Sequence, residues 1–164
     1  MSTQIIEAQA GNITEEMSFI AQKEDLSEEF VREKVAQGRI VILKNNQRKN
    51  SIPVAVGEGV SIKINANIGT SNERSTLEQE LDKVRVIEQT GADVLMDLST
   101  GSNIDEVRRK IIASTTLPIG TVPMYQAGKE ALDEHHNIAK LSKDKLFADI
   151  EKQCRDGVDF ITVH

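Results

Sequence analysis

Four side chains that could contact a small polar ligand stand at the ends of predicted strands. They are Asn67, Met96, Tyr125 and His164, and the intervals between them are 29, 29 and 39 residues. An amide and a phenol can form hydrogen bonds, a thioether can supply an apolar wall, and an imidazole can donate a hydrogen bond or move a proton. These residue types suit a binding site for a small molecule.

Each of the four also has a purely structural interpretation. Asn67 is an ordinary turn residue, Met96 is typical of a core, Tyr125 could be a half-buried aromatic residue, and His164 ends the chain. A site is favoured because all four are predicted to occupy the same position in a repeating unit. Parallel α/β folds bind ligands at the carboxyl ends of their strands.

A repeating pattern of strand and helix begins at Val60. Ser75 with Glu78 predicts one helix start, Gly91 its end, and Asn103 the start of the next helix. The segment 117–126 is predicted to be extended and 132–140 to be a polar connection. The other predicted elements are the strands 60–67, 93–100 and 158–164 and the helix 142–157.

Two helix exits, TGADVLMD and DGVDFITV, share a glycine and an aspartate before the strand. Such βα repeats form parallel strands with right-handed crossovers. Residues 58–164 are therefore predicted to form the first four βα units of a (β/α)8, TIM-like barrel. A flavodoxin-like open sheet is the alternative, but IGTSN after the first strand is not a glycine-rich phosphate loop.

Residues 1–57 are predicted to form a small α+β region before the barrel. Thr14 begins one helix, Asp25 with Glu28 begins another, and Gly38 ends it. The strands 39–44 and 52–56 follow, separated by the polar loop KNNQRKNS.

Composition excludes several classes of partner. The chain has 164 residues, a formal charge of −6 and only 3% aromatic residues, so nothing favours nucleic acid or an anionic membrane as a partner. Its longest apolar runs are too short to span a bilayer, and no secretory signal begins the chain, so a cytoplasmic location is expected. The single cysteine, Cys154, is predicted to be a small core residue, and no metal site is predicted. His135 and His136 are assigned to a solvated loop.

Long ordered blocks of the sequence resemble the phosphomethylpyrimidine synthase family. They are GNITEEMSFIA, EEFVREKVAQGRIVI, VSIKINANIGTS, ADVLMDLSTGSNIDEVRRKII, PIGTVPMYQA and GVDFITVH. The resemblance implies a TIM barrel enzyme of thiamine biosynthesis, a lyase that uses S-adenosylmethionine, an iron–sulfur [4Fe-4S] cluster and a zinc-type divalent metal. It implies conversion of 5-aminoimidazole ribotide to 4-amino-5-hydroxymethyl-2-methylpyrimidine phosphate, and a homodimer.

The family's substrate contacts fall on the Asn of NANIG, the Met of VLMDLSTG, the Tyr of PMYQ and the His of the fourth-strand motif. By resemblance, Asn67, Met96, Tyr125 and His164 bind substrate, and no residue of this chain is assigned a bond-breaking role. The family holds its cluster with a Cys-x-x-Cys-x4-Cys pattern, which one cysteine cannot supply. The chain is therefore expected to be an N-terminal fragment, inactive alone, whose open sheet edges favour aggregation or dimerisation.

Two other hypotheses remain open. The chain could be a non-catalytic half-barrel that binds substrate or assists assembly. It could also be a different small β/α enzyme, for which Asp97 and His164 are the only plausible acid/base pair.

Overall fold

The protein is described by a computed structural model that covers residues 2–71 and 75–163. The chain forms two compact units. One comprises the residues up to Lys44 together with Ile52–Lys63, and the other comprises Asn45–Ser51 and the residues from Ile64 onward. The boundary predicted between residues 57 and 58 thus falls inside the first unit, and the loop 45–51 belongs to the second.

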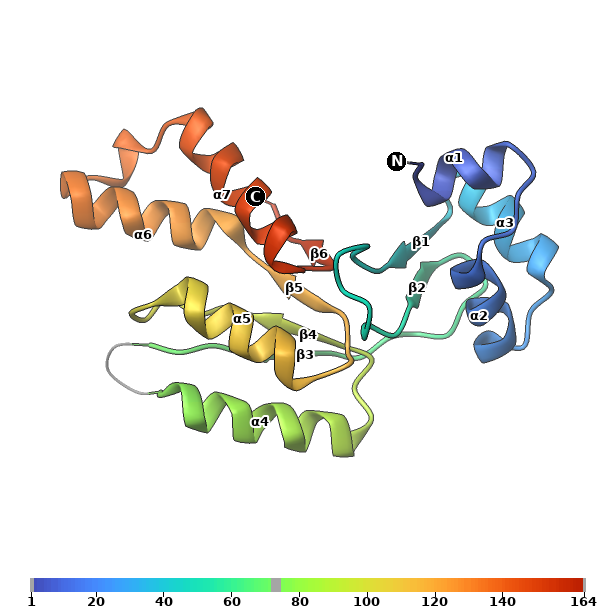
Figure 1. Ribbon diagram of the computed structural model, residues 1–164, viewed down its shortest axis with the longest axis horizontal. Coiled ribbons are helices and arrows are strands. Elements are labelled where there is room, and N and C mark those ends of the chain that lie inside the picture. Colours follow the sequence, from blue (N-terminus) through green and yellow to red (C-terminus); the bar gives the residue numbers. More distant parts are fainter. Residues whose placement is uncertain (1, 72–74, 164) are drawn as a thin grey trace. The chain divides into compact units, whose positions relative to one another are not determined.

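Three helices and a hairpin make up the first unit (Figure 1). They are α1 (Gln4–Gln9), α2 (Glu15–Glu24), α3 (Glu28–Ala36) and the antiparallel strands β1 (Ile40–Leu43) and β2 (Val54–Gly57). Thr14 caps α2 as predicted. The predicted cap of α3 was wrong: the Ser27 side chain accepts from the Phe30 amide, while Asp25 ends α2 in a left-handed conformation.

A four-stranded parallel sheet forms the centre of the second unit (Figure 1). Its order is β3 (Asn65–Ile68), β4 (Val94–Asp97), β5 (Ile119–Thr121) and β6 (Phe160–Ile161). The connecting helices are α4 (Leu77–Thr90), α5 (Ile104–Ser114), α6 (Pro123–His135), the short 3-10 turn η1 (Ile138–Lys140) and α7 (Lys143–Asp156). The predicted α/β class and the parallel strand order are confirmed.

The two faces of this sheet differ in character. Ile68, Leu95 and Ile119 pack with buried residues of α4 and α5 in one hydrophobic cluster, and we call their side the helix face. Because successive strand residues point to opposite sides, Asn67 and Met96 lie on the other side, which we call the open face.

The aspartates of the two similar helix exits have the same role. Asp93 accepts a hydrogen bond from the Ile64 amide at 2.8 Å, and Asp159 accepts one from the Ile119 amide at 2.8 Å. Each carboxylate thus joins the start of its own strand to the start of the neighbouring strand. Gly91 and Gly157, with φ of 79° and 105°, end the preceding helices as predicted.

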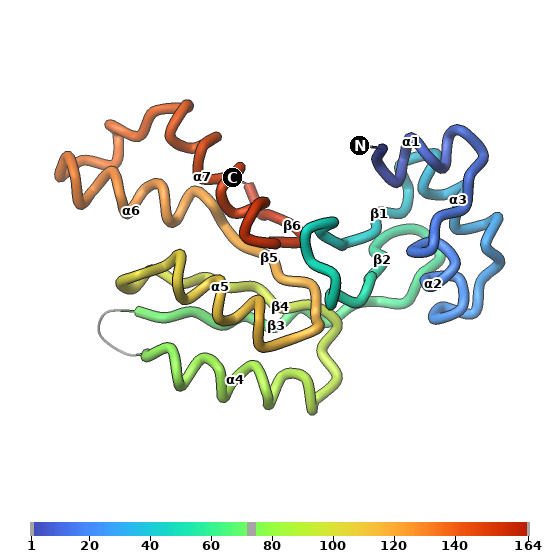
Figure 2. The backbone as a smooth tube through the Cα atoms, viewed as in Figure 1, coloured from blue at the N-terminus to red at the C-terminus, as the bar shows by residue number. Residues whose placement is uncertain are grey.

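The polar loop 45–51 packs beside β6 at the amino ends of the strands (Figure 2). Its Arg48 is buried and pairs with Asp159 at 2.7 Å. The Asp159 carboxylate also accepts from the Asn45 amide and the Ser51 hydroxyl. One buried aspartate therefore fixes the loop and two strands together.

Two predictions about the last helices were wrong. The segment 117–126 is extended only to Thr121, and Pro123, at the first helical position, begins α6. On α7 the buried residues are Asp149 and Gln153, whereas Cys154 is exposed rather than in the core. On this face Gln153 accepts from the Thr121 hydroxyl and donates to the Gln126 amide oxygen, while Asp149 pairs with Lys145 of α7 itself.

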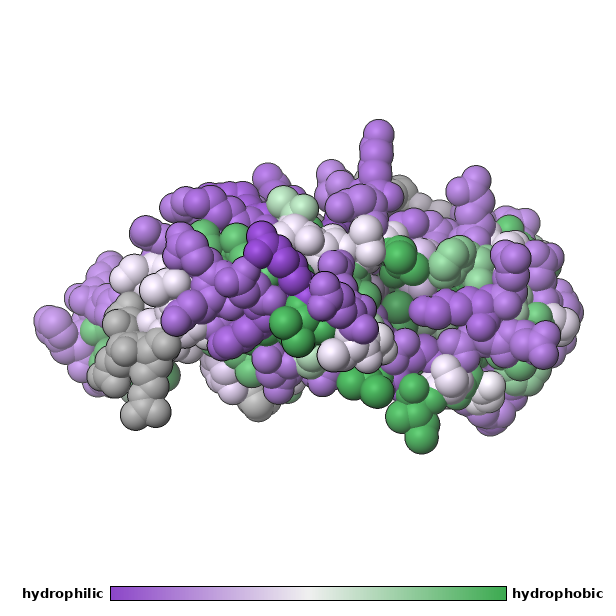
Figure 3. Space-filling model, turned by 90° about the horizontal axis from the view of Figure 1, so that it is seen from below, coloured by the Kyte–Doolittle hydropathy of each residue, from purple (hydrophilic) through white to green (hydrophobic). Residues whose placement is uncertain are grey.

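The surface on the α4 side is mostly hydrophilic, and its hydrophobic side chains form small separate groups (Figure 3). Within the described residues, no helix is both long and apolar enough to cross a membrane.

Candidate functional site

One row of residues crosses all four strands on the open face. Asn67 pairs with Met96, Met96 with Gly120, and Gly120 with Phe160. We call these four residues the open-face row. Two of the four predicted site residues, Asn67 and Met96, are thus direct neighbours in the sheet.

The amide of Asn67 has a defined orientation in this row. The Nδ2 group of Asn65, two residues earlier on the same face, donates to the Oδ1 atom of Asn67 at 3.2 Å. The Nδ2 group of Asn67 therefore remains the part of that amide able to donate to a ligand. On the other side of Met96, its sulfur lies 3.9 Å from the Thr162 hydroxyl of the chain segment that continues β6.

The other two predicted residues are not in this row. Tyr125 lies in the first turn of α6 and not at the end of a strand, because the strand stops at Thr121 and Pro123 begins the helix. Its position is still at the carboxyl end of β5, and the residue is 42% exposed. His164 lies outside the described residues.

The loops after β3 and β4 are joined by buried hydrogen bonds. The Ser99 hydroxyl accepts from the Thr70 amide at 3.0 Å, and the Thr100 and Gly101 amides both donate to the Thr70 carbonyl. A β-carbon at Gly69 would lie 2.7 Å from the Leu98 backbone. Glycine is required there because the two loops approach so closely.

Two buried carboxylates serve these loops in different ways. Glu80 accepts from the Gly69 amide at 2.8 Å and from Lys83 at 2.7 Å. Burial raises the pKa of Glu80, but these bonds and one from Ser75 outweigh it, so the pKa lies below its ordinary value. Burial raises the pKa of Asp97 above its ordinary value, and hydrogen bonds from Ser99 only partly oppose this.

A polar network lies between the helix face and the helices α5, α6 and α7. Arg108, 1% exposed, donates to Asp156 at 2.6 Å, to Asp105 at 2.6 Å and to Gln126 at 2.8 Å. Gln153 donates to the same Gln126 oxygen at 3.1 Å. This network holds the first turn of α6, and with it Tyr125, against α5 and α7.

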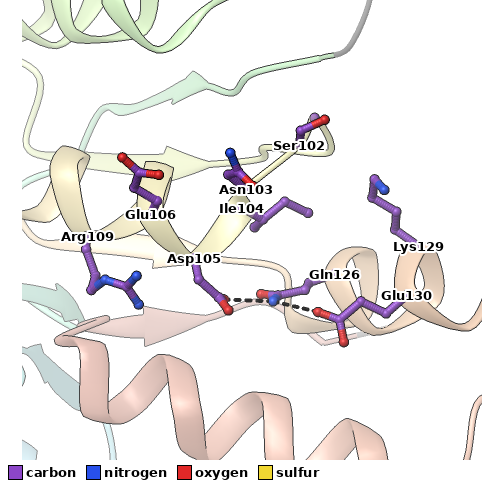
Figure 4. A pocket seen from close by; sticks show the side chains of 10 residues that line it. Ser102, Asn103, Ile104, Asp105, Glu106, Arg109, Gln126, Lys129 and Glu130 are labelled. Carbon is purple, nitrogen blue, oxygen red and sulfur yellow. Dashed lines mark hydrogen bonds between the residues drawn. The ribbon is translucent and has the colours of Figure 1, made fainter. Parts of the chain in front are cut away.

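An open groove of about 420 Å³ runs beside this network, between the start of α5 and the outer side of α6. Figure 4 shows Gln126 between the carboxylates of Asp105 and Glu130, donating to each. The groove carries acidic and basic groups together, since Arg109 and Lys129 also line it. Asn67, Met96 and Tyr125, the predicted site residues that the structure describes, do not line this groove.

Acid should weaken the network through Asp105. Partial burial raises the pKa of Asp105, but hydrogen bonds from Lys152, Gln126 and Arg108 outweigh it and hold the pKa well below the ordinary value. A carboxyl with a lowered pKa in the folded state stabilises the fold above its unfolded pKa of about 4 and loses this contribution as the pH falls below that value.

We therefore expect the free energy of unfolding of the wild-type chain to fall as the pH is lowered below about 4. In Asp105→Asn it should fall less steeply. Urea unfolding at a series of pH values measures this. Asp144→Asn, at an exposed position in the first turn of α7, is the control and should follow the wild-type slope. Equal slopes for wild type and Asp105→Asn would contradict the assignment.

No metal centre is formed by the described parts of the chain, 2–71 and 75–163. No group of three or more His, Cys, Asp or Glu side chains there is arranged to hold an ion. His135 is the last residue of α6 and His136 caps it, so both belong to a helix end rather than to the predicted loop.

A sequence model described as "Radical SAM ThiC family" matches residues 3–164. The chain belongs to this family. The ThiC family relatives named phosphomethylpyrimidine synthase include those of Carboxydothermus hydrogenoformans, 49% identical, and Syntrophus aciditrophicus, 47% identical. Another ThiC relative, from Moorella thermoacetica and 46% identical, is named 5-hydroxybenzimidazole synthase BzaB. Each match covers 99% of this chain and 38% of the relative.

Membership of the ThiC family confirms the resemblance found in the sequence. The chain spans 38% of the length of these curated relatives. Sequence reasoning missed two members of the open-face row, Gly120 and Phe160. They are level with Met96 because of the parallel register of β4, β5 and β6, for which IGT and DFIT carry no local signal.

Proposed function

We propose that this chain is part of a phosphomethylpyrimidine synthase, and that it contributes binding contacts for 5-aminoimidazole ribotide. The enzyme would convert this substrate to 4-amino-5-hydroxymethyl-2-methylpyrimidine phosphate by S-adenosylmethionine radical chemistry. The observation that supports the substrate site most directly is the pairing of Asn67 with Met96 on the open face. It places a hydrogen-bond donor beside an apolar wall at the carboxyl end of a parallel sheet.

The contacts proposed for each residue follow from its chemistry. The Asn67 Nδ2 group donates to an acceptor on the substrate, because Asn65 occupies the Oδ1 atom. The Met96 thioether lies against an apolar part of the ligand. Tyr125, at the start of α6, and His164 supply further hydrogen bonds to the substrate. All four residues position the substrate and none breaks a bond.

The described residues do not fit the family's iron–sulfur cofactor. A [4Fe-4S] cluster is held by several cysteine thiolates, whereas the sequence has one cysteine, exposed on α7. The proposed site residues of this chain would instead bind the substrate, orient it and limit the access of water to it.

The overall reaction can be tested with the gene product that contains this chain, purified without oxygen. Supplied with 5-aminoimidazole ribotide, S-adenosylmethionine and a reductant, it should form the pyrimidine phosphate, identified by mass spectrometry. Formation of 5-hydroxybenzimidazole instead would overturn the proposal in favour of the activity named for the Moorella relative. The same preparation serves for measuring the affinity of variants for 5-aminoimidazole ribotide.

Reversing the hydrogen-bonding character of one side chain should reveal the role of Asn67. Asn67→Asp has nearly the same shape but replaces the Nδ2 donor with an acceptor, so we expect affinity for 5-aminoimidazole ribotide to fall roughly tenfold or more. Titration calorimetry measures it. Asn50→Asp, the same change at an exposed residue of the loop 45–51, should leave affinity unchanged. Unaltered binding by Asn67→Asp would remove Asn67 from the site.

A further inference from the structure

The fourth member of the open-face row, Phe160, has no place in the site as proposed so far. It lies level with Met96 because both residues pair with Gly120. Phe160 is half-buried, although its neighbours on the helix face of the same strands belong to a hydrophobic core. An aromatic ring on the open face therefore needs an explanation other than that core.

The ring occupies the space where Gly120 has no side chain. A β-carbon built on Gly120 would lie 2.3 Å from both the Cε2 and Cζ atoms of Phe160, far closer than real contacts allow. Gly120 does not have a positive φ, so its backbone does not require glycine. The requirement comes from the ring, which extends from β6 across β5 towards β4.

Gly120 thus lets side chains of two non-adjacent strands approach each other. The contact between Thr162 and the sulfur of Met96, at 3.9 Å, crosses the same gap. Asn67, Met96 and Phe160 then form a continuous surface with a donor at one end and an aromatic ring at the other. Such a surface matches a planar heterocycle that carries a hydrogen-bond acceptor.

We infer that Phe160 is a specificity-determining residue that contacts the planar ring of the ligand, and that Gly120 is required to hold the phenyl group in that position. The inference rests on the proposed function. It adds an aromatic contact with the aminoimidazole ring to the hydrogen bond that Asn67 donates to the substrate. The aromatic ring packs against the aminoimidazole ring of the substrate.

A mutant cycle tests the placement of the ring, using the gene product that contains this chain. Gly120→Ala should lower the midpoint of thermal unfolding by several degrees, since the methyl group and the ring cannot share the space. Adding Phe160→Leu should restore part of the loss. Gly128→Ala is the control, because on α6 a β-carbon would meet only the flexible end of Ile138 at 3.0 Å. Additive effects of the two changes would overturn the placement.

Ligand binding tests the contact itself, with 5-aminoimidazole ribotide and ribose 5-phosphate as probes. Phe160→Leu should weaken binding of the ribotide roughly threefold to tenfold and leave ribose 5-phosphate unaffected, because only the ribotide carries the planar ring. Gly120→Ala should give the same selective loss with the phenyl group intact. Gly128→Ala should change neither affinity.

The outcomes separate this inference from the proposed function. If the wild type binds the ribotide and Phe160→Leu binds it equally well, Phe160 is only a packing residue and the inference fails alone. Equal weakening for both probes would also overturn it, since the effect would not concern the planar ring. If the wild type fails to bind the ribotide, the proposed function fails and the inference with it.

Discussion

Arg48→Met should lower the free energy of unfolding by about 3–5 kcal/mol, the range found when one partner of a buried ion pair is removed. The side chains of Arg48 and Asp159 are 3% and 0% exposed. The guanidinium also donates to the Leu117 carbonyl at 2.7 Å and to the Ile112 carbonyl at 3.2 Å. The substitution leaves the buried charge of Asp159 without its cationic partner and removes a donor from these two carbonyl groups.

Urea unfolding of wild type and variant measures this effect. Lys49→Met, at the exposed next position of the same loop, is the control and should change stability by less than about 1 kcal/mol. The double variant Arg48→Met/Asp159→Asn should be more stable than Arg48→Met alone, because it removes the unpaired charge. If Arg48→Met were as mild as Lys49→Met, the loop would not hold the strands together.

In the second unit, those features that depend on local sequence signals could be predicted. Gly91 and Gly157 end helices by their left-handed backbone, and the order of strands and helices follows from the spacing of apolar residues. The loop 45–51 could not be placed, because Arg48 and Asp159 are 111 residues apart and nothing local joins them. A charged residue in a polar loop gives no sign that it will be buried.

The site was predicted in part, and for a similar reason. Asn67 and Met96 lie opposite each other because β3 and β4 are aligned at their starts, where the Ile64 amide donates to the Asp93 carboxylate. The prediction that Tyr125 ends a strand was wrong, because Pro123, which is compatible with an extended segment, begins a helix instead. Phe160 was missed because its relation to Met96 depends on a glycine in the strand between them.

Arg108→Met should be the second severe substitution, lowering the free energy of unfolding by about 3 kcal/mol, the lower end of the range for a broken buried pair. Its guanidinium serves Asp105, Asp156 and Gln126 at once. Lys152 still reaches Asp105 at 2.9 Å, which limits the effect. Arg108→Lys should also be destabilised, because an ammonium group cannot reproduce the three-way geometry of the guanidinium.

Arg109→Met is the matched control for Arg108→Met, since Arg109 is the next residue, is 55% exposed and lies 3.7 Å from the same Asp156. An exposed pair of this kind contributes less than about 1 kcal/mol. Tyr125 is the only tyrosine of a chain without tryptophan, so its intrinsic fluorescence reports on the first turn of α6. Arg108→Met should alter that fluorescence under native conditions and Arg109→Met should not, because only Arg108 bonds to the adjacent Gln126. If both variants kept the wild-type signal and stability, the buried network would not be what positions Tyr125.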